Sequence, residues 1–217
     1  MTKAVLFDMD GLLIDSEKLS CNIFKDILRE YDIEFTDEQY FSEHCGKTPE
    51  TNMQILIDRY KLPVSVEDGV NKIGQLDEKN IVNGIPLKPG AEKLLEYLKS
   101  NNYKMALASS SPKQRAMRIL ESDNVKQYFD EFSFGCEVEH GKPFPDIFLN
   151  AAKKLDELPE NCLVLEDSEA GIQAAHSAGI PVICIPDVKV PDKEFLDMTE
   201  KVYTSLTDII DYLEKEM

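Results

Sequence analysis

The chain has 217 residues, enough for one large domain or for a core with a smaller second module, and its composition favours a globular protein. Its formal net charge of −17 argues against binding to nucleic acid or to an anionic membrane surface, because clustered Lys and Arg hold both. The five cysteines are odd in number and contain no C-x-x-C pair, which is typical of reduced thiols in a cytoplasm.

The amino-terminal region begins with a short apolar run, Ala4–Phe7, which predicts a buried strand. This run starts too early for a signal peptide, and no apolar stretch approaches a membrane span, so we expect a cytoplasmic protein. Asp8-Met9-Asp10-Gly11 follows directly. Alternation along the strand end places Asp8 and Asp10 on the same side, and Gly11 lets the chain turn beside a ligand.

A helical insertion follows, from about Ser16 to Val82, in which strand signals are missing. Its predicted helices are Glu17–Tyr31, Asp37–His44, Pro49–Tyr60 and Ser65–Ile81. Asn83-Gly84-Ile85-Pro86 then indicates a linker. We therefore predict a core of residues 1–15 and 83–217 and a helical domain of residues 16–82 inserted after the first strand.

The rest of the chain alternates between helical segments and short apolar runs. The predicted helices are Gly90–Ser100, Pro112–Glu121, Pro145–Leu155 and Ser168–Ala178. The predicted strands are Met105–Ala108, Phe132–Phe134, Leu163–Leu165 and Val182–Ile185. Strands that are apolar throughout are typical of a parallel sheet covered on both faces. The alternation therefore predicts an α/β fold: a Rossmann-like, three-layer core with a parallel sheet.

Polar residues follow four of the predicted strands, and carboxyl ends of parallel strands share one edge of the sheet. These residues are Asp8 with Asp10, Ser109-Ser110-Ser111, Lys142-Pro143, and Glu166-Asp167. Taken singly, each is more often a helix cap or a solvated loop residue. Together they predict a crowded polar site whose acidic cluster needs a cation.

Such a group of residues suits phosphoryl transfer. Carboxylates such as Asp8 and Asp167 are oxygen ligands that suit Mg²⁺. Lys142 and the Ser109 hydroxyl could neutralise and hold the phosphoryl oxygens. A carboxylate nucleophile would form an aspartyl-phosphate, and Asp10 is placed to protonate the leaving oxygen and then activate water.

These motifs resemble the haloacid dehalogenase superfamily over nearly the whole chain. The matching residues are Asp8-Met9-Asp10-Gly11-Leu12, Ser109, Lys142-Pro143 and Glu166-Asp167. The strings Gly141-Lys142-Pro143-Phe144-Pro145-Asp146 and Leu165-Glu166-Asp167-Ser168-Glu169-Ala170-Gly171 resemble the β-phosphoglucomutase-like phosphatase branch.

The resemblance implies a role for each matching residue. Asp8 is the nucleophile and a metal ligand, and Asp10 is the general acid and base and binds Mg²⁺ through its carbonyl. Ser109, Ser110 and Lys142 bind phosphate. Asp167 binds the metal. Glu166 either positions the metal-binding residues without touching the metal or binds the metal itself. The helical insertion corresponds to the family's cap, which excludes stray water.

Departures from the family's pattern favour a phosphatase over its relatives. Dehalogenases and phosphonoacetaldehyde hydrolases lack the second aspartate, here Asp10. Sugar-phosphate mutases resemble this branch but carry a cap histidine and a cap arginine where Ser20 and Pro49 stand. A mutase stays the main alternative. We further hypothesise that Glu17 and the Gly46-Lys47 loop contact the leaving group, although a solvated lysine explains Lys47 equally well.

Two other classes of protein share part of this pattern of site residues. Receiver domains use a similar acidic site but are shorter and lack a cap. A phosphate-binding module without catalysis would have no need for Asp10. We therefore expect a monomeric enzyme acting on a small phosphorylated metabolite, with sugar phosphates ahead of nucleotide monophosphates and polyol phosphates.

Overall fold

The structure, a computed structural model, describes residues 2–216, which form two compact units. The first holds residues 2–15 and 86–216, and the second is Ser16–Ile85. The segment that leaves the first unit forms backbone hydrogen bonds with the segment that returns to it. Asp15 N–H donates to the Pro86 carbonyl at 3.2 Å, and Lys88 N–H donates to the Leu13 carbonyl at 2.9 Å.

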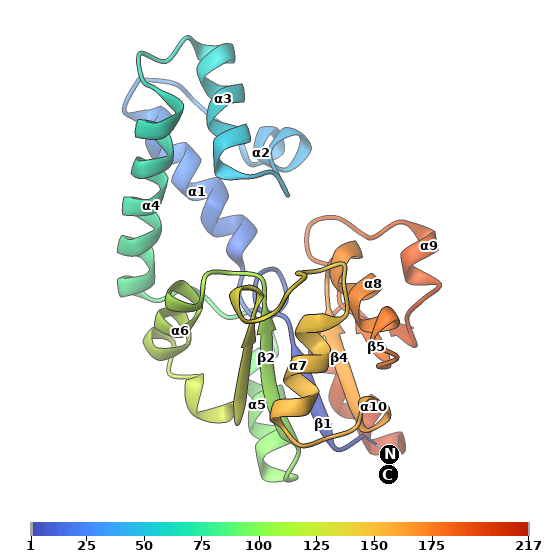
Figure 1. The fold of residues 1–217 in the computed structure, drawn as a ribbon. Helices are drawn as coiled ribbons and strands as arrows, with labels where there is room; N and C mark the ends of the chain where they lie inside the picture. Colours follow the sequence, from blue (N-terminus) through green and yellow to red (C-terminus); the bar gives the residue numbers. More distant parts are fainter. Residues whose placement is uncertain (1, 217) are drawn as a thin grey trace. The chain divides into compact units, whose positions relative to one another are not determined.

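A six-stranded parallel sheet forms the middle layer of the first unit, in the order β3-β2-β1-β4-β5-β6 (Figure 1). Its strands are β1 (Ala4–Phe7), β2 (Lys104–Ser109), β3 (Glu131–Phe134), β4 (Cys162–Glu166), β5 (Val182–Cys184) and β6 (Lys201–Val202). The register sets Phe7 at the end of β1 between Leu107 and Leu165. The residues that follow these positions therefore emerge at one edge.

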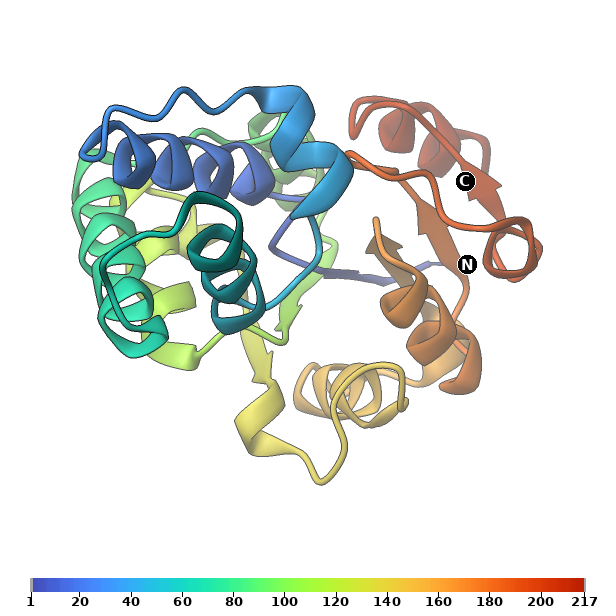
Figure 2. The same cartoon turned by 90° about the horizontal axis from the view of Figure 1, so that it is seen from above.

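Helices cover both faces of this sheet (Figures 1 and 2). The helices α7 (Asp146–Lys154) and α8 (Glu169–Ser177) pack on the face that carries Ala4 and Leu6 of β1. The helices α5 (Ala91–Ser100) and α10 (Asp208–Glu216) contact each other and cover the opposite face. The remaining elements are α6 (Lys113–Ser122), α9 (Lys193–Leu196), η1 (Lys126–Tyr128), η2 (Gly135–Glu137) and η3 (Pro159–Asn161). The predicted α/β fold class is confirmed.

The second unit is entirely helical in its regular structure. Its helices are α1 (Ser16–Arg29), α2 (Asp37–Glu43), α3 (Pro49–Tyr60) and α4 (Val66–Asn83). Their apolar faces form a separate core that includes Phe24, Leu28 and Met53. The helix α4 extends past the predicted end at Ile81, so Asn83 belongs to the helix and the turn comes at Gly84, where φ is +84°.

Candidate active site

Asp8 stands one residue beyond β1, at the carboxyl edge of the sheet, and is only 7% exposed. Its backbone N–H donates to the Leu165 carbonyl at 3.1 Å, which fixes the residue between β1 and β4. Its Oδ1 accepts a hydrogen bond from Lys142 Nζ at 2.5 Å. Burial raises the pKa of Asp8 to about 7, although Lys142 opposes the shift. The carboxylate therefore depends on nearby positive charge to stay ionised at neutral pH.

Lys142 lies between two buried carboxylates. Its Nζ donates to Glu166 Oε1 at 2.6 Å as well as to Asp8, and it lies 4.9 Å from the centroid of the Phe148 ring. Burial alone lowers the pKa of Lys142, but the charges of Asp8 and Glu166 outweigh it and raise the pKa above its usual range. This side chain is therefore a fixed positive charge beside the Asp8 carboxylate.

Glu166 is fully buried at the end of β4 and has donors on both carboxylate oxygens. Its Oε2 accepts from the Asp167 N–H, the Ser168 N–H and the Ser168 hydroxyl, each at 2.9 Å, while Lys142 occupies Oε1. A Cβ at Gly171 would lie 1.7 Å from Oε1, so only glycine fits on the facing turn of α8. With both oxygens occupied, the supporting role predicted for Glu166 is favoured over direct metal binding.

Asp10 contacts Ser111, which the sequence groups at this edge, and Arg115, which it does not. Ser111 Oγ donates to Asp10 Oδ2 at 2.7 Å, and Arg115 Nη1 donates to Oδ1 at 3.0 Å. Arg115 also donates to Ser111 Oγ at 3.2 Å. Ser111 precedes α6 and Arg115 lies in its first turns, four residues later. Because Ser111 lies before the helix, no helical spacing in the sequence points from it to Arg115.

The predicted phosphate-binding serines occupy different environments. Ser109 ends β2, is 1% exposed, and accepts a hydrogen bond from the Ser111 N–H at 3.1 Å through its Oγ. Ser110 is the next residue in the loop and is exposed. The structure therefore places Ser109 at the same sheet edge as Asp8, and phosphate binding by either serine stays a prediction.

Asp167 follows β4 and lies directly against the turn after β1. Gly11 adopts φ +85°, and a Cβ there would lie 2.3 Å from Asp167 Oδ2 and 3.3 Å from Asp187 Oδ2. Burial raises the pKa of Asp167 to about 9, and Glu166, Asp8 and Asp187 add to the shift. Asp187 was not predicted. It follows β5 as the other acids follow their strands, so the same rule would have found it.

The charge balance of this edge fits a divalent cation. Five carboxylates lie here: Asp8, Asp10, Glu166, Asp167 and Asp187. Within residues 2–216 their ion pairs are with three cations, Lys142, Lys88 and Arg115, which leaves a formal excess of two negative charges. Among residues 2–216, no three His, Cys, Asp or Glu side chains form a ready metal cluster. Mg²⁺ does not require one, because it keeps several waters and takes one or two carboxylates.

The predicted substrate contacts in the helical unit stay predictions. Glu17 accepts a hydrogen bond from the Tyr40 hydroxyl at 2.8 Å. Gly46 adopts φ +73°, and Lys47 donates to the Glu43 carbonyl. Their loop is braced by the buried Asn52, whose Nδ2 donates to the His44 carbonyl at 3.0 Å.

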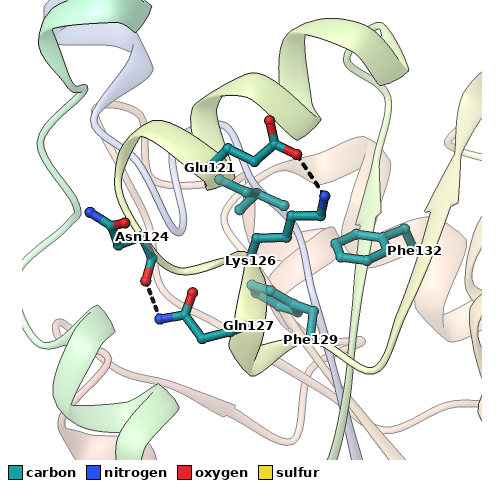
Figure 3. A pocket seen from close by; sticks show the side chains of 7 residues that line it. Glu121, Asn124, Lys126, Gln127, Phe129 and Phe132 are labelled. Atoms are coloured by element: carbon teal, nitrogen blue, oxygen red, sulfur yellow. Dashed lines mark hydrogen bonds and ion pairs between the residues drawn. The ribbon is translucent and has the colours of Figure 1, made fainter.

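A pocket of about 400 Å³ lies beside η1, between the end of α6 and the start of β3 (Figure 3). It is lined in part by Phe129 and Phe132, at the amino end of β3, and by Glu121 and Lys126, which form an ion pair at 2.6 Å. Asp8, Ser109 and Asp167 all stand at the carboxyl ends of their strands. The pocket therefore belongs to the other edge of the sheet.

The family described as haloacid dehalogenase-like hydrolase matches residues 5–185, most of the chain and all of the residues grouped at the sheet edge except Asp187. The chain belongs to this family. A phosphorylated carbohydrates phosphatase of Thermotoga maritima is 33% identical over 178 residues, covering 82% of each chain. The beta-phosphoglucomutase of Bacillus subtilis is 32% identical over 185 residues, covering 82% of this chain and 80% of the mutase.

The solved structures agree with this assignment. A Thermotoga maritima protein provisionally described as a beta-phosphoglucomutase superposes with a TM-score of 0.89 at 28% identity, covering all of both chains. The predicted superfamily and branch are confirmed, as is the prediction of an enzyme. Relatives named as phosphatases support a phosphoric monoester hydrolase. Separately, no helix built by residues 2–216 has the length and apolar character needed to cross a membrane.

Proposed function

We propose that this protein is a Mg²⁺-dependent phosphatase that hydrolyses small phosphate monoesters through an aspartyl-phosphate on Asp8. The observation that carries the proposal is the contact between Lys142 and Asp8 at the carboxyl edge of the sheet, with Asp167 on the adjacent strand. The Asp8 and Asp167 carboxylates and the Asp10 carbonyl would hold Mg²⁺. When bound, the ion neutralises phosphoryl oxygens and keeps the acidic cluster ionised.

In the first step, Asp8 attacks phosphorus and the bond from phosphorus to the leaving oxygen breaks. Lys142 neutralises charge on the phosphoryl oxygens, and Ser109 with nearby backbone N–H groups orients them. Asp10 in its protonated form gives its proton to the leaving oxygen. The alcohol departs, and the phosphoryl group is held on a carboxylate that Lys142 already contacts.

In the second step, Asp10 has lost its proton and serves as the base. It takes a proton from a water molecule, the water oxygen bonds to phosphorus, and the bond between phosphorus and Asp8 breaks. Phosphate leaves and both carboxyl groups regain their starting protonation states. Ser111 and Arg115 donate hydrogen bonds to the Asp10 carboxylate and so restrict its orientation for this proton transfer.

We propose a sugar phosphate as the substrate class, because a relative of similar length is named a phosphorylated carbohydrates phosphatase. A screen of phosphate release over phosphorylated sugars, nucleotide monophosphates and polyol phosphates tests the class. A strong preference for a nucleotide would contradict it.

The catalytic proposal is tested with p-nitrophenyl phosphate and Mg²⁺. We expect Asp8→Asn to abolish turnover and Asp10→Asn to slow it by about 10²–10⁴, because Asp10 supplies acid–base catalysis. Asp197→Asn is a matched control, since its carboxylate pairs with Lys193 on the surface. Near wild-type rates in Asp8→Asn would rule out Asp8 as the nucleophile.

A sugar-phosphate mutase is the second candidate, because a beta-phosphoglucomutase is as similar to the chain as a phosphatase. Incubation with glucose 1-phosphate separates the two. A mutase yields glucose 6-phosphate in proportion to enzyme, whereas the proposed phosphatase releases inorganic phosphate and leaves glucose.

A further inference from the structure

Asp187 is a buried carboxylate with one oxygen that has no hydrogen-bond partner among the described residues. Its side chain is only 8% exposed, and Oδ1 forms an ion pair with Lys88. Oδ2 has no hydrogen-bond partner within the described part of the chain. A buried carboxylate oxygen without a donor is costly, and such groups are usually paired or face a cation.

The unpartnered oxygen is directed at the proposed metal edge. Oδ2 of Asp187 and Oδ2 of Asp167 both approach the space above Gly11, at 3.3 and 2.3 Å from the position that a Cβ would take there. Two carboxylate oxygens therefore approach one place beside Gly11, an arrangement that a bound cation stabilises.

Lys88 fixes the orientation of this carboxylate. Its ammonium binds Oδ1, and its backbone N–H donates to the Leu13 carbonyl in the loop that follows Asp10. The lysine is thus anchored to the same loop that carries the proposed nucleophile and acid. Because Lys88 takes only Oδ1, Oδ2 is left to face Asp167.

We propose that Asp187 is a positioning residue for the divalent cation: held by Lys88, it accepts a hydrogen bond through Oδ2 from a water in the hydration shell of the cation. This inference rests on the proposed function, which supplies the cation. Magnesium suits such an arrangement, since it keeps several waters when bound to protein. Carboxylates that hydrogen-bond to the direct ligands of a metal commonly orient those ligands and raise the affinity for the metal.

Metal affinity tests the proposal without relying on catalysis. Binding of Mn²⁺ to the full chain is measured from the free-ion signal in electron paramagnetic resonance, and Mg²⁺ competes for the site. We expect Asp187→Asn to weaken Mn²⁺ binding about tenfold. Asp197→Asn, which removes a surface carboxylate, is the control and should bind as the wild type does. Equal affinities in Asp187→Asn and the wild type would show that Asp187 only partners Lys88.

Lys88→Met is a second variant whose Mn²⁺ affinity tests the proposal even if Asp187→Asn does not fold. It removes the ion pair that orients the Asp187 carboxylate, so we expect Mn²⁺ to bind several-fold more weakly, although the loss of a positive charge alone would strengthen cation binding. An affinity equal to the wild type would mean that Asp187 does not face the cation. A wild-type protein that binds no Mn²⁺ at all would instead refute the metal site of the proposed function, so the two failures are distinguishable.

Discussion

The guanidinium of Arg115 donates a hydrogen bond to Oδ1 of Asp10 at 3.0 Å, while Ser111 occupies the other oxygen. Both oxygens of the proposed acid and base therefore have partners on the α6 side of the site. Hydrogen bonds of this kind restrict the orientation of the carboxylate.

We expect Arg115→Met to lower kcat about tenfold with little change in KM, because Asp10 loses part of the positioning that acid–base catalysis needs. Steady-state kinetics on p-nitrophenyl phosphate measure the change, and rapid quenching measures the phosphoenzyme. Arg115→Lys should recover part of the loss. Arg29→Met, at a surface ion pair with Asp26, is the control. A kcat unchanged in Arg115→Met would remove this residue from the site.

Gly171 and Gly74 offer a matched pair of helical glycines. A Cβ at Gly171 would lie 1.7 Å from Glu166 Oε1, whereas Gly74 has open space around it. We expect Gly171→Ala to destabilise the protein by about 1–3 kcal/mol through overpacking, and to reduce turnover because Glu166 and Lys142 must shift. Gly74→Ala should stabilise by up to about 1 kcal/mol through helix propensity. Urea unfolding measures both variants, and similar effects of the two would contradict the packing argument.

His44 makes the helical unit sensitive to acid. Burial lowers the pKa of His44 below its usual value, although its hydrogen bond with Asn52 opposes the shift. The unfolded chain then binds a proton more readily than the folded one. Stability is therefore fully present above the unfolded pKa near 6.5 and is lost as the pH falls below it.

We expect the difference in Tm between pH 7.5 and pH 5.5 to be smaller in His44→Gln than in the wild type. His176→Gln, at an exposed position, controls for the loss of a histidine. The same pH dependence in His44→Gln and in the wild type would exclude His44 as the source.

Removal of divalent cations should abolish turnover and lower the free energy of unfolding. With Mg²⁺ at 100 times its Kd, binding to the folded state alone stabilises by about 2.7 kcal/mol, which thermal denaturation measures as a rise in Tm. Excess EDTA should abolish turnover and reverse that rise, and added Mg²⁺ should restore both. Full activity in excess chelator would contradict a Mg²⁺ site.

Much of the fold and of the candidate site could be predicted because parallel strands impose strong patterns. Buried runs such as Ala4–Phe7 are apolar throughout, and the polar residue that ends each one must lie at the common edge. The pattern therefore predicts that Asp8, Ser109 and Asp167 lie at one edge. The strand β6 was missed because it has only two residues and both are exposed, so it carries no apolar run.

The residues that were missed depend on side-chain directions, which a pattern of residue types does not contain. Arg115 resembles any surface cation on an amphipathic helix until the position of Asp10 is known. Lys88 lies 99 positions from Asp187 in the sequence. The backbone pairing of Leu13 and Asp15 with Pro86 and Lys88 holds Lys88 at this edge of the sheet, and no local pattern predicts that pairing.

The pairing of Leu13 and Asp15 with Pro86 and Lys88 has a consequence for how the chain can vary. The first unit forms its own backbone hydrogen bonds at the place where residues 16–85 depart and return, so the sheet edge that carries Asp8 does not need any particular insert to form. Such a junction makes the helical unit exchangeable. We expect that an insert of another sequence and length, grafted between Asp15 and Pro86, leaves Asp8, Lys142 and Asp167 in place.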